Sequence, residues 1–204
     1  MRAWTHIRAG TPSSVLTLSP SVPLPTISSP NHVLVQVTHA ALNPGASIMM
    51  QLCPFVFRSR PGVPELDFSG RIVAAGSGVA AARNLQPGTP VFGSVTVGPH
   101  LSSGAGALAE YVAIDAATVV RKPDGASFEE AAGLGVAGCT ALVLVEKAGL
   151  KKGDSVLVNG ASGGIGHIVI QMVKKKVGES GRVVGVCSGG NAEMVRTLGA
   201  DEVS

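Results

Sequence analysis

Cysteine is scarce in this sequence of 204 residues, which contains three of them. Cys53, Cys139 and Cys187 lie far apart and form neither a C-x-x-C pair nor a compact group of metal ligands. A disulfide framework or a structural zinc site needs such pairs or groups. Both are therefore excluded as the basis of the fold, and a reducing compartment is expected.

Aromatic side chains, dense basic patches and long apolar runs are lacking as well. One tryptophan, one tyrosine and five phenylalanines are spread along the chain, and the net charge of +3 arises from 16 basic and 13 acidic residues. Nucleic-acid binding usually requires a clustered basic surface. Crossing a bilayer requires about 20 consecutive apolar residues. We therefore expect neither a nucleic acid nor a membrane as a partner.

Acidic residues are absent before Glu65. An acid-free start that contains arginine and serine is typical of a mitochondrial transit peptide. Against this, five prolines between Pro12 and Pro30 would break the amphipathic helix that such a peptide needs. The cytoplasm is therefore the expected location, and mitochondrial import is the less favoured alternative.

A glycine-rich turn between an apolar strand and a helix is the most informative segment that is present. Residues 155–158 predict a buried strand, and Gly163, Gly164 and Gly166 follow it. Glycines there let the backbone approach a dinucleotide pyrophosphate and let the helix pack on its strand. Apolar residues at 165, 168, 169, 172 and 173 then follow helical spacing, and a second strand is predicted over 183–187.

The turn departs from the usual G-x-G-x-x-G pattern, because Ala161 stands in the place of the first glycine. The strand before it and the helix and strand after it favour a dinucleotide site. The alternative is a strand–turn–helix of another α/β protein that binds no nucleotide.

The end of the second strand bears on the choice of nicotinamide cofactor. An NAD site usually places Asp or Glu about 20 residues after the glycines. This chain has Ser188, Gly189, Gly190 and Asn191 there, so no carboxylate would repel a 2′-phosphate, although the loop also lacks an arginine to pair with one. NADP is therefore the favoured cofactor. Asn191 also precedes a predicted helix over 192–198 and is a suitable N-cap for it.

Two regions of different pattern divide the chain. Residues 1–125 hold most of the prolines and predict a small, irregular all-β domain. Its β-like runs lie at 33–37, 70–74, 91–93 and 109–114, with turn sequences at 86–90 and 123–125. From Ser127 the period becomes helical, beginning with a capping box that includes Glu130. We therefore predict a second, α/β domain over residues 126–204.

Six motifs follow one another along the chain: Ala41-Leu42-Asn43-Pro44, Asp67-Phe68-Ser69-Gly70-Arg71-Ile72-Val73, Leu85-Gln86-Pro87-Gly88, Ala109-Glu110-Tyr111-Val112, Ala137-Gly138-Cys139-Thr140-Ala141 and Leu198-Gly199-Ala200-Asp201-Glu202-Val203. In these motifs and their order, the whole chain resembles the medium-chain dehydrogenase/reductases, in particular their zinc-independent, quinone-reductase-like branch. The opening residues 1–4 and Asp67-Phe68 are similar to fungal members, which include trans-acting enoyl reductases that serve polyketide synthases. The resemblance implies a fold of class α/β plus β: a GroES-like β domain followed by an incomplete Rossmann domain, which is a doubly wound parallel sheet. It also implies an active site in the cleft between the two domains.

The resemblance also bears on zinc. Metal-dependent members of the superfamily place a cysteine where this chain has Asn43, and Gly-His-Glu where it has Leu66-Asp67-Phe68. Neither substitution supplies a zinc ligand set, so no metal is expected. His39 or His100 is an alternative ligand, but a catalytic zinc needs three convergent ligands.

The resemblance further implies the residues of the site. Where the family usually has an Asp soon after Asn-Pro, often followed by a Lys, this chain runs through residues 45–49 without a charge, so a polar anchor near the cofactor is lost. No side chain is identified as the proton donor, since Tyr111, the only tyrosine, lies in a strand motif. The segment from Gly135 to Thr140 is implied to line the reaction cleft, with Gly135, Val136, Ala137, Gly138 and Cys139 on the substrate. The implied cofactor contacts are Asn43, Pro44, Gly45 and Ala46 at the nicotinamide half, Thr140, the pyrophosphate turn Ser162, Gly163, Gly164 and Ile165, and the loop of Ser188, Gly189, Gly190 and Asn191.

The implied reaction is hydride transfer from NADPH to an activated double bond, as in an enoyl thioester or an enone, or to a quinone. The substrate would be a small molecule or bound to an acyl carrier, and a polyketide synthase of fungal secondary metabolism is the implied partner. Relatives continue well beyond the motif that ends at Val203, so the chain is expected to be truncated. Two hypotheses follow: part of an active reductase, or a catalytically silent remnant or regulatory partner of one. The oligomeric state is not predicted.

Overall fold

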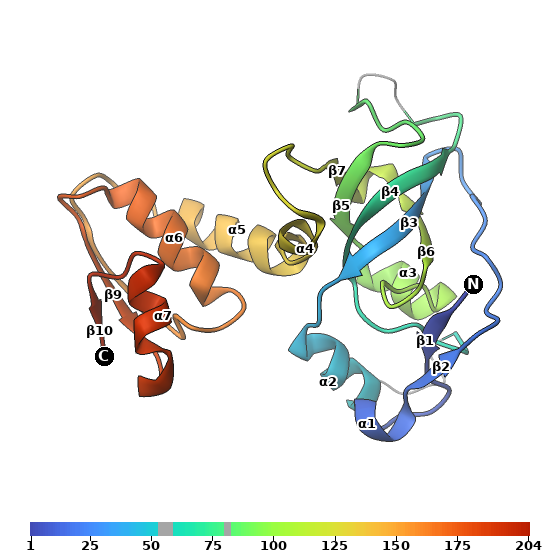
Figure 1. Ribbon diagram of the computed structural model, residues 1–204, viewed down its shortest axis with the longest axis horizontal. Coiled ribbons are helices and arrows are strands. Elements are labelled where there is room, and N and C mark those ends of the chain that lie inside the picture. Colours follow the sequence, from blue (N-terminus) through green and yellow to red (C-terminus); the bar gives the residue numbers. More distant parts are fainter. Residues whose placement is uncertain (53–58, 80–82) are drawn as a thin grey trace. The chain divides into compact units, whose positions relative to one another are not determined.

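The computed structural model describes residues 1–52, 59–79 and 83–204. The chain divides into two compact units, Met1–Gly135 and Val136–Ser204 (Figure 1). Each unit has its own hydrophobic core. Cys53 lies outside the described residues, whereas Cys139 is exposed and Cys187 is half-buried. Within the described ranges, the helices stay too short or too polar to cross a bilayer.

The first unit is built on the strands β1 Ala3–Thr5, β2 Thr17–Ser19, β3 His32–Ala40, β4 Asp67–Ala75, β5 Pro90–Ser94, β6 Tyr111–Asp115 and β7 Val119–Arg121. β1 and β2 pair with each other. The others form an antiparallel sheet in the order β6-β3-β4-β5-β7. The central pair, β3 and β4, runs from Val33 opposite Ala75 to Ala40 opposite Phe68, with shifts of register that disrupt the ladder locally.

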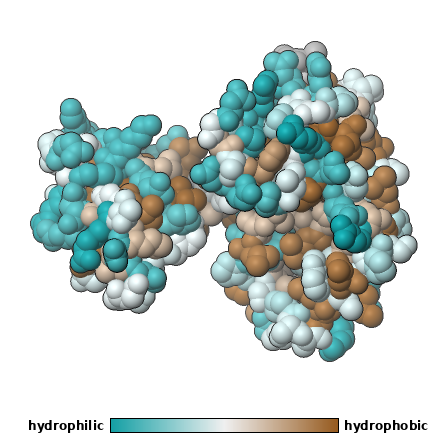
Figure 2. Space-filling view, viewed as in Figure 1, coloured by the Kyte–Doolittle hydropathy of each residue, from teal (hydrophilic) through white to brown (hydrophobic). Residues whose placement is uncertain are grey.

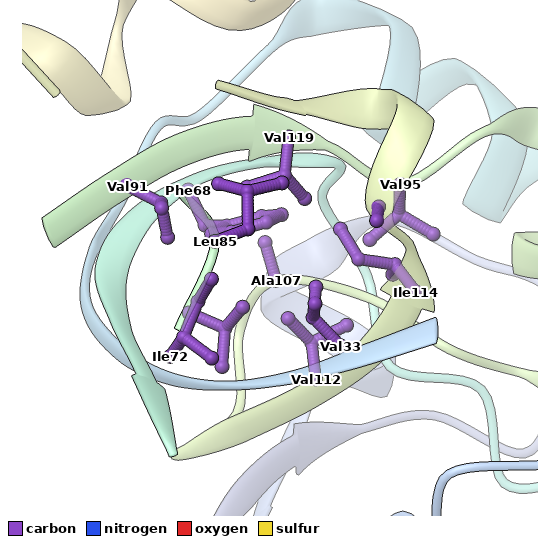
Figure 3. Close-up of a cluster of buried hydrophobic side chains, with 12 residues drawn as sticks. Val33, Phe68, Ile72, Leu85, Val91, Val95, Ala107, Val112, Ile114 and Val119 are labelled. Atoms are coloured by element: carbon purple, nitrogen blue, oxygen red, sulfur yellow. The ribbon is translucent and has the colours of Figure 1, made fainter. Parts of the chain in front are cut away.

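Alternating side chains of this sheet form the core of the first unit (Figure 3). Val33 and Val35 of β3, Phe68 and Ile72 of β4 and Val91 of β5 are all buried. Branched and aromatic side chains suit a pleated, half-buried surface, and their burial contributes about 25 cal/mol for each Å² removed from water. The β-like runs predicted from the sequence are therefore confirmed as strands.

Helices also belong to the first unit, so the prediction of an all-β domain was wrong in this respect. They are α1 Pro12–Val15, α2 Pro44–Leu52, α3 Val97–Ser103 and α4 Phe128–Ala132. α2 buries Ala46 and Met50, which lie four residues apart and hence on one face. Helices this short show too few turns of periodicity to be recognised in a region rich in proline and glycine.

α4 extends the first unit beyond the predicted boundary after residue 125. Its capping box forms as predicted, because the Ser127 hydroxyl accepts from the N–H of Glu130 and the Glu130 carboxylate accepts from the N–H of Ser127. The helix packs on β3 and β4, and the Ser69 hydroxyl donates to the carbonyl of Phe128 at 2.6 Å. Since α4 is fastened to the sheet in this way, the compact unit runs on to Gly135.

Strands and helices alternate in the second unit: α5 Cys139–Lys147, β8 Ser155–Asn159, α6 Gly166–Val177, β9 Arg182–Val186, α7 Ala192–Thr197 and β10 Glu202–Val203. The strands form a parallel sheet in the order β10-β9-β8. α6 buries Val169 and Val173 at the predicted spacing, and Lys174 to Lys176 lie in its last turn, where cations suit the helix dipole. The predicted fold class, a β unit followed by an incomplete doubly wound sheet, is confirmed.

β8 lies at an edge of the sheet, since among the described residues it pairs with β9 alone. Leu157 in β8 is 66% exposed. A groove of about 590 Å³ lies beside the strand and is lined by apolar side chains of α5, β8 and α6 and by the glycine turn. An unpaired edge with exposed apolar side chains favours association with another chain.

Replacing Leu157 with Lys should reduce self-association of the 204-residue chain with little change in thermal stability. The side chain is exposed, and a charge on an edge strand disfavours edge-to-edge pairing. Sedimentation velocity over a range of concentrations would measure the effect. Leu18→Lys makes the same change at an exposed position of β2 and serves as the control. Equal association of the Leu157 variant and the native chain would contradict the prediction.

Candidate cofactor and active site

The glycine turn joins the end of β8 to the start of α6. Gly160 has a positive φ of 71°, so the left-handed residue of the turn is Gly160, and Ala161 carries no such strain. Ala161 is buried, and its N–H donates to the carbonyl of Val186 at 2.9 Å. Alanine at the place of the first glycine therefore fits the turn and ties it to β9.

Gly166 and Gly164 serve the turn in different ways. A Cβ at Gly166 would overlap the carbonyl oxygen of Gly160, so the start of α6 can approach the turn only with glycine at this position. A Cβ at Gly164 would meet nothing within 4 Å. The N–H groups of Gly164 and Ile165 have no backbone acceptor in the described parts of the chain, and no side chain caps α6. These donors at the head of a helix fit a phosphate group.

The two predicted cofactor loops meet in the second unit. The Asn191 side-chain amide donates to the Ser162 hydroxyl at 3.3 Å and to the Ser188 hydroxyl at 3.0 Å. Asn191 is the N-cap residue of α7, as predicted, but its side chain makes no capping hydrogen bond to that helix. Its side chain instead links the glycine turn to the loop that follows β9.

In the first unit, Asn43 lies between two buried carboxylates. Its side-chain amide donates to Asp67 Oδ2 at 3.2 Å, and its backbone N–H donates to Glu65 Oε2 at 2.9 Å. Pro44 follows as the first residue of α2. The two positions at which metal-dependent members carry Cys and Gly-His-Glu thus lie together and are joined by a hydrogen bond.

This pair does not suit zinc. The Asn43 nitrogen is committed as a donor, and Asp67 offers oxygen alone, whereas catalytic zinc sites use three ligands drawn from His, Cys and carboxylates. In the described parts of the chain, no three His, Cys, Asp or Glu side chains are grouped to hold a metal. The metal-independent mechanism remains a prediction.

Glu65 is a residue of this site that the sequence did not single out. It is 5% exposed and has a positive φ of 65°, which is uncommon outside glycine. Burial raises the pKa of its carboxyl above the ordinary value, hydrogen bonds from Asn43 act in the opposite direction, and the Asp67 charge raises it further. The available signals were its place as the first acidic residue and its spacing two residues before Asp67.

The segment from Gly135 to Thr140, which was predicted to line the reaction cleft, spans the boundary between the two units. Gly135 lies against Asp67 in the first unit, and a Cβ there would overlap the carboxylate. In the second unit, Val136, Ala137 and Gly138 belong to a π-helical turn that leads into α5, and Cys139 is exposed. The Thr140 hydroxyl donates to the carbonyl of Val136 at 2.7 Å. Glycine at 135 is thus required by its buried neighbour.

Two histidines that were considered as metal ligands have other partners. His39 Nε2 lies 3.2 Å from Glu129 Oε1, which joins β3 to α4. His100 is buried, and its Nδ1 lies 2.7 Å from the carbonyl oxygen of Ala105. A separate hollow of about 740 Å³ in the first unit is lined by residues 22–26 and parts of α3 and β6, and its lining does not include Asn43, Asp67 or Gly135.

The raised pKa of Glu65 predicts that replacing it with Gln changes how stability depends on pH. The folded chain holds the Glu65 proton more tightly than the unfolded chain, so the native free energy of unfolding should fall as pH rises from 4.5 through the raised pKa. Glu65→Gln removes this fall while keeping an oxygen that can accept from Asn43. Relative to the native chain, the variant should therefore gain stability as pH rises from 4.5 through the raised pKa, as measured by urea unfolding.

Glu110→Gln is a control of opposite sign. Hydrogen bonds from Arg2 lower the pKa of this exposed carboxyl, so its stabilising effect is present above the ordinary pKa and lost on acidification. The Gln variant should therefore lose stability relative to the native chain as pH rises. Parallel pH profiles for Glu65→Gln and the native chain would contradict the prediction.

Comparison with known proteins gives a consistent result for both units. Residues 29–124 match the alcohol dehydrogenase GroES-like domain family. A trans-enoyl reductase of Penicillium oxalicum is 34% identical, and the match covers 100% of this chain and 60% of the enzyme. The predicted GroES-like domain is therefore confirmed.

Solved structures extend the likeness through the second unit. The quinone oxidoreductase of Coxiella burnetii matches with a TM-score of 0.86 and 31% identity, covering 100% of this chain and 62% of that one. A mycobacterial protein complexed with NADPH matches with a TM-score of 0.83 and 26% identity, covering 100% and 58%. The chain thus spans about three-fifths of the length of these relatives. These likenesses, together with the β unit and the glycine turn, show that the chain belongs to the medium-chain dehydrogenase/reductase superfamily.

Proposed function

We propose that this chain carries the β domain and the first half of the cofactor domain of an NADPH-dependent, metal-independent reductase. The observation that carries the proposal is the glycine turn at the head of α6, joined to the loop after β9 by Asn191, in a member of this superfamily. The acceptor would be an activated double bond, as in an enoyl thioester or an enone, or a quinone. Likeness to a trans-enoyl reductase and to a quinone oxidoreductase supports this range.

The residues of the second unit fit a dinucleotide phosphate. Gly164 and Ile165 offer backbone N–H donors, and Gly164 leaves open space where a side chain would otherwise stand. Ser188 and Asn191 place a hydroxyl and an amide where NAD sites usually carry a carboxylate, which supports NADP. When bound, the cofactor supplies the hydride, and the chain supplies its binding and orientation.

The surface around Asn43 supports an apolar acceptor. Leu42 and Leu52, at the two ends of the segment that includes α2, are each 76% exposed, and Ile48 is also exposed. Figure 2 shows hydrophobic side chains on the part of the first unit where Figure 1 places α2. A bound acyl chain or quinone ring would cover these apolar side chains, and their burial would favour binding. We propose an acyl chain carried as a thioester, delivered by an acyl carrier of a polyketide synthase.

A second candidate function is that of a catalytically silent remnant or regulatory partner. The observation that favours it is the open edge of β8, with Leu157 exposed beside an apolar groove. A polypeptide that supplies the remaining strands of a doubly wound sheet would pair there. In either case we propose the cytoplasm as the location.

Substitutions in the glycine turn should separate cofactor binding from folding. Gly166→Ala should destabilise the second unit, because its methyl group would overlap the carbonyl of Gly160. Gly164→Ala should fold normally but weaken NADPH binding about tenfold or more, because the methyl group stands between the backbone and the phosphate. Thermal unfolding and NADPH fluorescence titration would measure the two effects.

Gly98→Ala provides the matched control, since a Cβ there also meets open space but lies in α3 of the first unit. Its NADPH affinity should equal that of the native chain. If Gly164→Ala also binds as the native chain does, the turn is not the phosphate site.

The reductase itself is tested by NADPH oxidation with a quinone and with an enoyl thioester as acceptors. Turnover by the purified 204-residue chain would overturn the remnant hypothesis. Turnover only after addition of a polypeptide that completes the sheet would support the reductase proposal and place the missing strands at β8. NADPH binding without turnover under either condition would favour the silent partner, and no binding at millimolar NADPH would overturn both the cofactor assignment and the proposed function.

A further inference from the structure

The chain between β3 and α2 is held to the start of β4 by side chains as well as by backbone. The N–H of Ala41 donates to the carbonyl of Asp67 at 3.0 Å. Two residues later, Asn43 donates its backbone N–H to Glu65 and its side-chain amide to Asp67. The β3–β4 ladder ends at Ala40 opposite Phe68. The carboxylates of Glu65 and Asp67 thus continue the cross-connection beyond the end of the ladder.

Glu65 carries a free-energy cost, in backbone conformation and in loss of hydration, that glycine would avoid at this position. Its positive φ crowds the Cβ against the backbone, and glycine would adopt this conformation freely. Its carboxyl is also withdrawn from water, and the resulting rise in pKa shows that burial disfavours the charged form. Hydrogen bonds from Asn43 act against this cost, including the 2.9 Å bond from its backbone N–H.

These contacts determine which way the Asn43 amide faces. A carboxylate accepts hydrogen bonds and does not donate them, so the Asn43 nitrogen must face Asp67. The amide oxygen Oδ1 is then directed away from Asp67 as the remaining acceptor. The backbone N–H of the same residue is fixed by Glu65. Buried carboxylates therefore hold both the backbone N–H and the side-chain amide of Asn43, immediately before α2.

We propose that Glu65 is a positioning residue which, with Asp67, fixes Asn43 so that its Oδ1 accepts a hydrogen bond from the bound cofactor. This role rests on the proposed reductase function for the identity of the ligand. The fixing of Asn43 itself is independent of that function. Glu65 acts through Asn43 and does not touch the reacting atoms.

Amide hydrogen exchange of the complete 204-residue chain tests the fixing of Asn43 without any ligand. Glu65→Gly removes the acceptor and relieves the backbone conformation, so global stability should not fall. The Asn43 amide should nevertheless exchange about tenfold faster, because a charge-assisted hydrogen bond is lost. The amide of Val35, in the β3 core, should be unaffected in the same sample. Glu65→Gln retains an acceptor oxygen and should restore exchange to within about threefold of the native rate.

Asn84→Gly is the control for backbone relief, since Asn84 also has a positive φ, of 50°, and the described hydrogen bonds that Asn43 donates go to Glu65 and Asp67 instead. It should leave the Asn43 amide unchanged. Unchanged Asn43 exchange in Glu65→Gly would overturn the positioning role. Equal acceleration of Asn43 and Val35 would also overturn it, because the change would then be global.

Turnover distinguishes this role from the proposed function. Where the native chain, alone or completed by added polypeptide, reduces its acceptor, Glu65→Gly should lower kcat about tenfold, because the Asn43 amide is then no longer fixed. Glu65→Gln should recover most of kcat. Equal loss in both variants would overturn positioning through an acceptor oxygen, whereas faster Asn43 exchange with no turnover in any chain would overturn the proposed function and support the positioning of Asn43.

Discussion

Close approach of backbone segments, possible only where a residue lacks a Cβ, is the constraint on which both units depend. In the first unit a Cβ at Gly70 would overlap the carbonyl of Gln36, so β3 and β4 pair at this point only with glycine. In the second unit the same constraint applies at Gly166, where a Cβ would overlap the carbonyl of Gly160 at the start of α6. The central ladder of one unit and the glycine turn of the other therefore depend on the same property.

Local pattern was sufficient to predict much of this fold. The β8–turn–α6 segment, the capping box at Ser127 and the strands β3 to β6 follow from periodicity and turn chemistry that lie within a few residues, whereas the short strands β1, β2 and β7 were not predicted. The features that escaped prediction depend on contacts between distant segments. α4 belongs to the first unit because Ser69 bonds to Phe128, 59 residues away. The Asn191 side chain turns to Ser162 rather than to its own helix, since the two loops meet only in the folded sheet.

The candidate site also combines features that follow from local sequence with features that depend on distant contacts. Asn43 and Gly135 could be selected by resemblance, but the reason for each identity lies in Asp67, which bonds to one and excludes a side chain from the other. Glu65 could not be selected, because nothing in its local sequence shows that its backbone is left-handed or that its carboxyl is buried. Polar residues whose roles are set by tertiary contacts are the least accessible to sequence patterns. Such departures from local sequence rules are expected at functional sites.

The position of β8 at the edge of its sheet has a thermodynamic consequence. The strand that leads directly into the glycine turn is also a strand with an open side among the described residues. Under the proposed function, a chain that pairs with β8 and a cofactor held by the turn would act on the same continuous segment. If one of these events favours the other, linkage requires the converse by the same factor.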